Sequence, residues 1–323
     1  MTELVTFGET ALRLSPPGDG RLETTDELDV WASGAASNVA VTASRLGTET
    51  TWTSTLADTP LGRRAVSELR GHGVTTDLTW TDADESRQGL TFFERGNEPR
   101  GNLVLDDRRG TAIESVEPSH LPMDAIQEAG AVFVSGESIA LGDAVAETAL
   151  AALRAASGAA VLGVDHRPDL WSAEAARETL TEMFPAVDIL VVNEEQAETV
   201  LQVSGRPPEI AHQIGSEYDF QTVVITQGDR GALVWHDETI HDRDAVETEP
   251  VETSGQHAAF TGAYLGRRVA GESVSDALTH GVAAAALSRT IPGPVPAVNP
   301  DEVERVVETM DGGSGGGGRS GIR

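Results

Sequence analysis

The chain has 323 residues with 23 basic and 52 acidic side chains, a formal net charge of −29, and no lysine and no cysteine. Without lysine, the P-loop pattern GxxxxGK[ST] and the protein-kinase signatures are excluded. Without cysteine, disulfides, thiolate zinc sites and thiol nucleophiles are excluded as well. A field this acidic repels DNA and anionic lipid, so neither nucleic acid nor a membrane surface is an expected partner.

The same composition is typical of a protein adapted to molar salt, where screening shrinks to a few Å and the acidic surface no longer repels itself. An acidic mesophilic enzyme is the alternative interpretation. No apolar run approaches roughly 18 residues, and Met1 leads directly into a strand pattern. We therefore expect no signal peptide, no membrane span and a cytoplasmic protein.

Strand and helix patterns alternate along the first part of the chain. They predict a buried strand at 3–9, a helix at 36–47, a strand at 50–57 and a helix at 60–73. Three turn-bounded segments follow, TTDLTWTD, RQGLTFFERG and GNLVLDDR, in which polar and apolar residues alternate. This alternation predicts a small exposed sheet rather than more parallel core.

The helix–strand alternation resumes after residue 129. Strands are predicted at 129–136, 159–165 and 188–193, helices at 144–158 and 273–290, and a strand pair at 221–236 that turns at Asp229–Arg230. Repeated alternation of this kind predicts an α/β fold with a mostly parallel sheet flanked by helices. Residues 311–323, DGGSGGGGRSGIR, predict a flexible tail outside the folded domain.

The stretch ETSGQHAAF at 252–260 is typical of a turn that enters a phosphate-binding helix. Small residues precede the helix, whose first amides are unpaired and electropositive. No GxGxxG follows the first strand, so a bound phosphate must be held by such amides and by arginine. Taken alone, the stretch could equally be an ordinary loop–helix junction.

Two stretches together, SGAASNVAVTASRLG at 33–47 and ETSGQHAAFTGAYL at 252–265, resemble the two signatures of the PfkB or ribokinase family of carbohydrate kinases. The likeness spans residues 3 to about 309, with VTFGETALRLSPPGDGRLE, DDRRGTA, HRPDLWS, VNEEQAE, TQGDRG and IPGPVPAVNP in family order. The opening, the DDR stretch and RPDLW are most similar to 2-keto-3-deoxygluconate kinases, with fructokinases next.

The resemblance implies a ribokinase-like three-layer sandwich with a mostly parallel central sheet and a small β-sheet lid. It places one domain at 1–310, with the lid from about 12–32 and 87–108, and leaves 311–323 as the tail. Lids of this family often pair between subunits, so a homodimer is expected. The family reaction is ATP-dependent phosphorylation of a sugar or sugar acid, which implies ATP and Mg²⁺ as cofactors and a small sugar as partner.

The resemblance also assigns site residues one by one. Contacts with the sugar or its carboxylate fall on Gly34, Asn38, Arg108 and Arg167, and an arginine pair suits a carboxylate through bidentate hydrogen bonds. The anion hole and nucleotide contacts fall on Asn193, Thr226, Gly228, Gly231, Ser254, Gly255, Gln256 and His257. No residue is assigned as a metal ligand, and a site at His236 and His241 is not expected because they flank a predicted hairpin turn.

The second signature departs from its usual form, D-T-x-G-A-G-D, at the chemistry itself. The last Asp of that form deprotonates the sugar hydroxyl, and its position here holds Ala258. The Ala and Gly before it become Gln256 and His257. Other departures from the family pattern are Ser33, Thr91, Gly163, Asp165, Gln196, Glu252 and Val282.

Three functions remain open from the sequence. The first is a carbohydrate-kinase relative that binds its sugar but transfers phosphate weakly or not at all. The second is an active sugar kinase with a rerouted base such as His257, which could accept a proton if its ring turns toward the sugar. The third is a non-catalytic regulatory or structural partner of a true kinase, in which the pockets would be filled.

Overall fold

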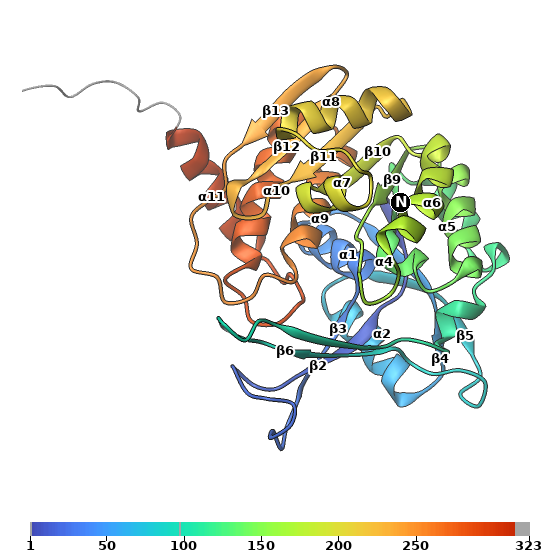
Figure 1. Ribbon diagram of the computed structural model, residues 1–323. Coiled ribbons are helices and arrows are strands. Elements are labelled where there is room, and N and C mark those ends of the chain that lie inside the picture. Colours follow the sequence, from blue (N-terminus) through green and yellow to red (C-terminus); the bar gives the residue numbers. More distant parts are fainter. Residues whose placement is uncertain (1, 97, 314–323) are drawn as a thin grey trace, which may run out of the picture.

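The computed structural model describes residues 2–96 and 98–313, which form two sheets and their helices (Figure 1). The main sheet has nine strands. In spatial order they are β13 (Thr239–Arg243), β12 (Ala232–His236), β11 (Thr222–Thr226), β10 (Ile189–Asn193), β9 (Ala159–Gly163), β8 (Ala131–Ser135), β1 (Leu4–Phe7), β4 (Thr50–Ala57) and β5 (Thr75–Thr81). Neighbours are parallel except for the antiparallel pairs β11–β12 and β12–β13. The predicted α/β fold with a mostly parallel sheet is confirmed.

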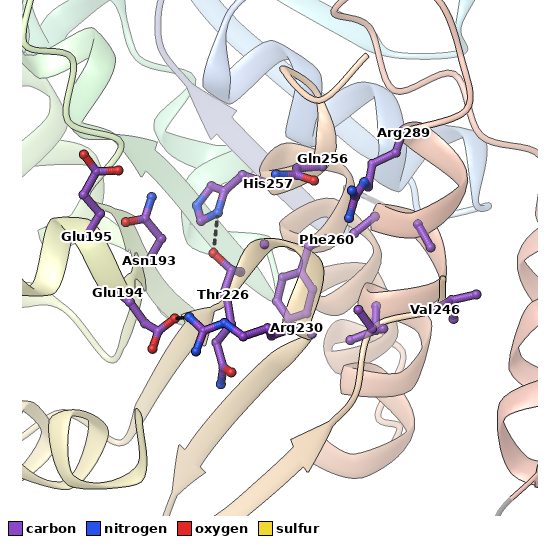
Figure 2. Close-up of a pocket in the computed structure, with 17 residues that line it drawn as sticks. Asn193, Glu194, Glu195, Thr226, Arg230, Val246, Gln256, His257, Phe260 and Arg289 are labelled. Carbon is purple, nitrogen blue, oxygen red and sulfur yellow. Dashed lines mark hydrogen bonds and ion pairs between the residues drawn. The ribbon is translucent and has the colours of Figure 1, made fainter. Parts of the chain in front are cut away.

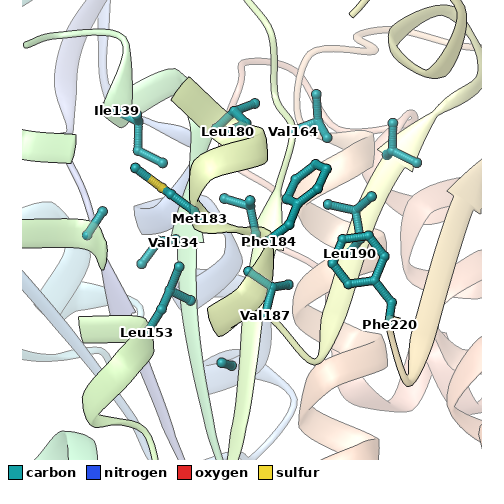
Figure 3. Packing of buried hydrophobic residues seen from close by; sticks show 14 of the residues in the cluster. Val134, Ile139, Leu153, Val164, Leu180, Met183, Phe184, Val187, Leu190 and Phe220 are labelled. Atoms are coloured by element: carbon teal, nitrogen blue, oxygen red, sulfur yellow. The ribbon is translucent and has the colours of Figure 1, made fainter. Parts of the chain in front are cut away.

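Helices cover both faces of the main sheet because its central strands are apolar on both sides. On β1, Val5 and Phe7 pack into one core cluster and Leu4 into the other. The first cluster lies under α5 (Asp143–Ala155), α6 (Ala173–Met183) and α8 (Pro207–Tyr218), and Figure 3 shows its centre around Phe184 and Leu190. The second lies under α1 (Ala35–Arg45), α9 (Gln256–Val269) and α10 (Val274–Ser288).

The remaining α-helices complete these layers. They are α2 (Pro60–Gly71), α3 (Met123–Glu128), α4 (Gly136–Ile139), α7 (Glu194–Thr199) and α11 (Pro300–Gly313). The sequence prediction named no helix at α3, α4, α6, α7, α8 or α11. In α11, Val303 packs into a cluster with α9 and α10. Residues 311–313 therefore belong to this helix and not to the predicted tail; the other tail residues lie outside the described part of the chain.

A second sheet, called the lid sheet below, has the strand order β3 (Asp29–Ser33), β2 (Ala11–Ser15), β6 (Leu90–Glu94) and β7 (Leu103–Asp107). The third segment expected in a small exposed sheet, TTDLTWTD, is instead β5, which pairs in parallel with β4 at the edge of the main sheet. The prediction was wrong there because an edge strand is covered on one face only, so it alternates just as an exposed strand does.

The two helices that carry the signature stretches touch at a glycine. A Cβ on Gly262 of α9 would lie 2.5 Å from the carbonyl oxygen of Val39 and 2.7 Å from Cβ of Thr42, both on α1. Only glycine permits this approach without displacement. Among the helices of the described residues, none combines the length and apolar character needed to cross a membrane.

Candidate active site

Two adjoining cavities open where the parallel strands end, the usual place for ligands in such sheets. The first, called the β11 cavity, has a volume of about 350 Å³ and lies between the turn after β11 and helices α9 and α10. The second, called the lid cavity, has a volume of about 410 Å³ and lies between the lid sheet and the starts of α1 and α9. Asn193 and His257 line both cavities.

The β11 cavity combines an apolar wall with cationic groups. Phe260, Val282 and Ala285 supply the wall, and Arg230 and Arg289 supply the charge. Figure 2 shows Phe260 and the two arginines at this cavity. Arg230 also forms an ion pair with Glu194. Such a slot suits a flat ring that carries an anionic chain.

The turn after β11 depends on glycine at two positions. Gly228 has a φ of +63°, and Gly231 has a φ of +109°. A Cβ on Gly231 would also lie 2.0 Å from the carbonyl oxygen of Arg243. Because residues with a side chain rarely adopt this backbone, the course of the turn that borders the β11 cavity depends on these glycines.

The lid cavity takes its shape from the start of α1. A Cβ on Gly34 would lie 2.3 Å from the carbonyl oxygen of Glu9, so the chain can come this close only at glycine. The Asn38 amide donates to the carbonyl oxygen of Pro294 and to Oγ of Ser33, each at 3.1 Å. These bonds fix the Asn38 side chain against the cavity wall.

Arg108 lies at the base of the lid cavity with 3% of its side chain exposed, and it contacts three carboxylates. Its guanidinium nitrogens lie 3.3 Å from Glu9, 2.6 Å from Asp106 and 2.8 Å from Glu137. Burial opposes the charge on Arg108, but these acids raise the pKa of its guanidinium above the usual range. Burial raises the pKa of Glu9 to about 7 despite the neighbouring arginine.

Arg167 meets Arg108 through a shared carboxylate. One Arg167 nitrogen lies 3.8 Å from Glu137, so the two arginines assigned to the substrate converge on this residue. Burial disfavours the charge of Glu137, but Arg108 and Arg167 hold its pKa below the usual range. With 35% of its side chain exposed, Arg167 remains open to a ligand in the lid cavity.

Arg13 contributes a further positive charge to the lid cavity. It lies over the ring of Phe93 at 3.7 Å and pairs with Glu252 at 3.1 Å. The Glu252 carboxylate also accepts from the backbone nitrogens of Thr253 and Ser254 at 3.1 Å. It thereby secures the loop that leads into α9.

His257, in the first turn of α9, lies between the two cavities. Its Nδ1 lies 3.0 Å from Oγ1 of Thr226, as Figure 2 shows, and its Nε2 lies 3.3 Å from Oδ1 of Asp165. The second contact is close but is not aligned as a hydrogen bond. The other Asp165 oxygen accepts from the Ser135 hydroxyl at 2.9 Å. Burial raises the pKa of Asp165, an effect that His257 partly offsets.

The structure brings most of the predicted site residues together. Those on the β11 cavity are Asn193, Thr226, Gly228, Gly231, Gln256 and His257; those on the lid cavity are Gly34, Asn38, Arg108, Arg167, Ser254 and Ala258. Ser254, assigned to the nucleotide side, thus borders the lid cavity instead, and Gly255 borders neither cavity. A Cβ on Gly255 would lie 2.7 Å from the carbonyl oxygen of Pro294, which explains the glycine by packing.

Several residues at the site had no assigned role in the sequence prediction, namely Arg13, Glu137, Asp165, Arg230 and Arg289. Asn193 has a structural role as well, because its side chain accepts from the nitrogen of Gln196 at 2.8 Å and caps α7. Among the described residues, no group of three or more histidine and acidic side chains is arranged to hold a metal ion.

Arg108 and Arg87, which pair with Asp106 and Asp107, allow a buried and an exposed ion pair to be compared for their effect on stability. Arg108→Gln leaves the buried acids without their cation and should lower the free energy of unfolding by about 3–5 kcal/mol. Arg87→Gln breaks an exposed pair with Asp107 and should cost about 0–1 kcal/mol. Urea unfolding at fixed salt measures both changes; equal losses would contradict this account of Arg108.

The chain resembles known proteins over nearly its whole length. The sequence model of the pfkB family of carbohydrate kinases matches residues 1–301. A 2-dehydro-3-deoxygalactonokinase of Haloferax volcanii is 43% identical over 314 residues, which cover 96% of this chain and 98% of that protein. A 2-dehydro-3-deoxygluconokinase of Thermoproteus tenax is 28% identical, with 96% and 95% of the two chains covered.

Solved structures agree with this fold. The crystal structure of the Thermotoga maritima 2-dehydro-3-deoxygluconokinase aligns with a TM-score of 0.88 at 28% identity and covers 95% of this chain and 100% of that one. An Escherichia coli structure in complex with ATP and Mg²⁺ aligns with a TM-score of 0.86 at 17% identity, over 96% and 100% of the chains, which shows a shared fold alone. With its ribokinase-like fold and this family match, the chain belongs to the PfkB family of carbohydrate kinases.

Proposed function

We propose that the protein binds a 2-keto-3-deoxy sugar acid in the lid cavity and ATP in the β11 cavity, and that it transfers the γ-phosphate slowly. One observation carries the proposal: two open cavities meet at the first turn of α9, where His257 lines both and Ala258 lines the lid cavity. The relatives named as kinases of 2-dehydro-3-deoxy sugar acids support this substrate class.

The β11 cavity suits ATP in shape and charge. The wall of Phe260 and Val282 can stack a base, while Arg230 and Arg289 can hold phosphates. Mg²⁺ is usually held by one or two carboxylates together with phosphate oxygens. Glu194 and Glu195 border this cavity and can supply such carboxylates to an ion that arrives with ATP.

The lid cavity suits an acid more than a neutral sugar. Arg167 is partly exposed there, and its contact with Glu137, at 3.8 Å, is long for an ion pair. A planar substrate carboxylate can engage this guanidinium through two hydrogen bonds. Glu137 already pairs closely with Arg108, so Arg167 is the arginine that the substrate meets first.

Slow transfer follows from the residues at the start of α9. Ala258 has no group that can accept a proton, and losing a positioned base typically costs about two to four decades in rate. Gln256 and His257 add side chains where small residues would let a phosphate approach, which disturbs an anion hole. A purely regulatory or structural partner with filled pockets is less well supported, because both cavities are open.

The direct test combines binding with turnover in molar KCl, a salt chosen because of the net charge of −29. Calorimetry should show binding of ATP–Mg²⁺ and of 2-keto-3-deoxygluconate or 2-keto-3-deoxygalactonate. A coupled assay of ADP formation should give a kcat below about 1 s⁻¹, the lower end for kinases. Absence of sugar-acid binding, or a kcat typical of a fast kinase, would refute the proposal.

A second prediction concerns the start of α9. Ala258→Asp alone returns a carboxylate to the helix N-terminus, where the dipole keeps it ionised, but the crowded loop remains, so little gain in kcat is expected. Adding Gln256→Ala and His257→Gly should raise kcat by about two decades or more. If the single variant performs as well as the triple variant, crowding at Gln256 and His257 is not the obstacle.

We also propose that the protein dimerises through the lid sheet. Leu103 and Leu105 on its edge strand β7 are 44% and 50% exposed. Replacing both with arginine should shift a dimer to monomer in sedimentation velocity. Ile240→Arg is the control, because Ile240 is 37% exposed on the edge strand β13 of the main sheet. A monomeric wild type would sink this idea.

A further inference from the structure

Resting on the proposed function, we infer that Asp165 is the proton acceptor for the sugar hydroxyl and that His257 positions its carboxylate. Asp165 follows β9 and lines the lid cavity, as Arg167 and Ala258 also do. Asp165 therefore brings a carboxylate to the cavity from the side of the sheet, whereas Ala258 at the start of α9 offers only a methyl group.

The Asp165 carboxylate has one hydrogen-bond donor and one close contact with a ring nitrogen. The Ser135 hydroxyl donates to Oδ2 at 2.9 Å, and Nε2 of His257 lies 3.3 Å from Oδ1. The backbone of Asp165 has a φ of +37°, which residues other than glycine rarely adopt. A strained conformation persists only where the surroundings impose it, and such residues gather at functional sites.

His257 is the less suitable acceptor because both of its ring nitrogens point at protein groups. Nδ1 meets the Thr226 hydroxyl at 3.0 Å, and Nε2 faces Asp165. Each carboxylate oxygen of Asp165 has two lone pairs, so one contact per oxygen leaves capacity for a sugar hydroxyl. His257 thus orients the carboxylate and lies between it and the β11 cavity.

The reaction balances with these groups. The sugar oxygen forms a bond to the γ-phosphorus, and its O–H bond breaks as the proton passes to the Asp165 carboxylate. The bond from the γ-phosphorus to the bridging oxygen of ADP breaks, and ADP leaves with the electron pair. The titratable or charged groups around Asp165 are His257, Glu137 and Arg167, and burial of Asp165 strengthens its carboxylate as a proton acceptor.

Asp165→Asn tests the role with little change in shape, since asparagine also tolerates positive φ. We expect kcat for 2-keto-3-deoxygluconate or 2-keto-3-deoxygalactonate to fall about a hundredfold or more, while KM and the calorimetric Kd stay within about threefold. Asp219→Asn is the matched control, because Asp219 has a φ of +59° and lines neither cavity. Thermal unfolding of each variant verifies that it folds.

The triple variant Gln256→Ala, His257→Gly, Ala258→Asp separates a chemical role from a structural one. In that background Asp165→Asn should change kcat less than threefold, because the carboxylate introduced at 258 accepts the proton. An equal loss in both backgrounds would make Asp165 a structural residue and overturn the inference. Loss of wild-type activity in His257→Ala but not in Asp165→Asn would also overturn it, and would identify His257 as the base.

The positioning role of His257 has its own readout. His257→Ala should lower kcat with KM unchanged, and His257→Gln, whose amide can donate toward Asp165, should recover part of the loss. If the wild type binds both ligands but turns over no faster than Asp165→Asn, the role of Asp165 fails while the proposed binding stands. If neither ligand binds, the proposed function itself fails.

Discussion

The contact between α1 and α9 at Gly262 is the constraint on which the site depends. At this point the two helices lie too close for any side chain, since a Cβ would fall 2.5 Å from a carbonyl oxygen of α1. Their starts, after Gly34 and Gly255, are therefore held in a fixed relation at the edge of the sheet. Because packed helices are rigid over such short distances, the residues after both caps reach the same cavity.

A second constraint joins the lid sheet to the body. Arg108, which follows β7 of the lid sheet, pairs with Asp106 on that strand, Glu9 after β1 and Glu137 in α4. Since buried charges must be paired, this cluster fixes the base of the lid cavity more than it adds net stability. It also places a protein carboxylate beside the arginines, so the sugar acid that we propose as substrate would share Arg167 with Glu137.

The sequence patterns predicted the layers of the fold because β–α alternation is a local signal. They failed at β5, which alternates like an exposed strand although it belongs to the main sheet. They also named no helix at α6, α8 or α11. Family resemblance placed the assigned sugar residues and most of the nucleotide residues on the cavities. It could not predict the contact between Asp165 and His257, because these residues come from different elements and meet only in the folded chain.

The two places for a carboxylate at this site differ in physical character. At position 258 a carboxylate would stand at a helix N-terminus, where the dipole keeps it ionised and weakens it as a base. Asp165 stands instead at the end of β9, where burial raises its pKa. A higher pKa makes each ionised carboxylate a stronger proton acceptor but reduces the fraction that is ionised at a given pH. His257 partly restores the ionised fraction of Asp165, because a positive charge at the imidazole favours the charged carboxylate. In the reaction that we propose, Asp165 and His257 supply a base from the side of the sheet. Gln256 and His257 then occupy space that small residues would leave open for a phosphate.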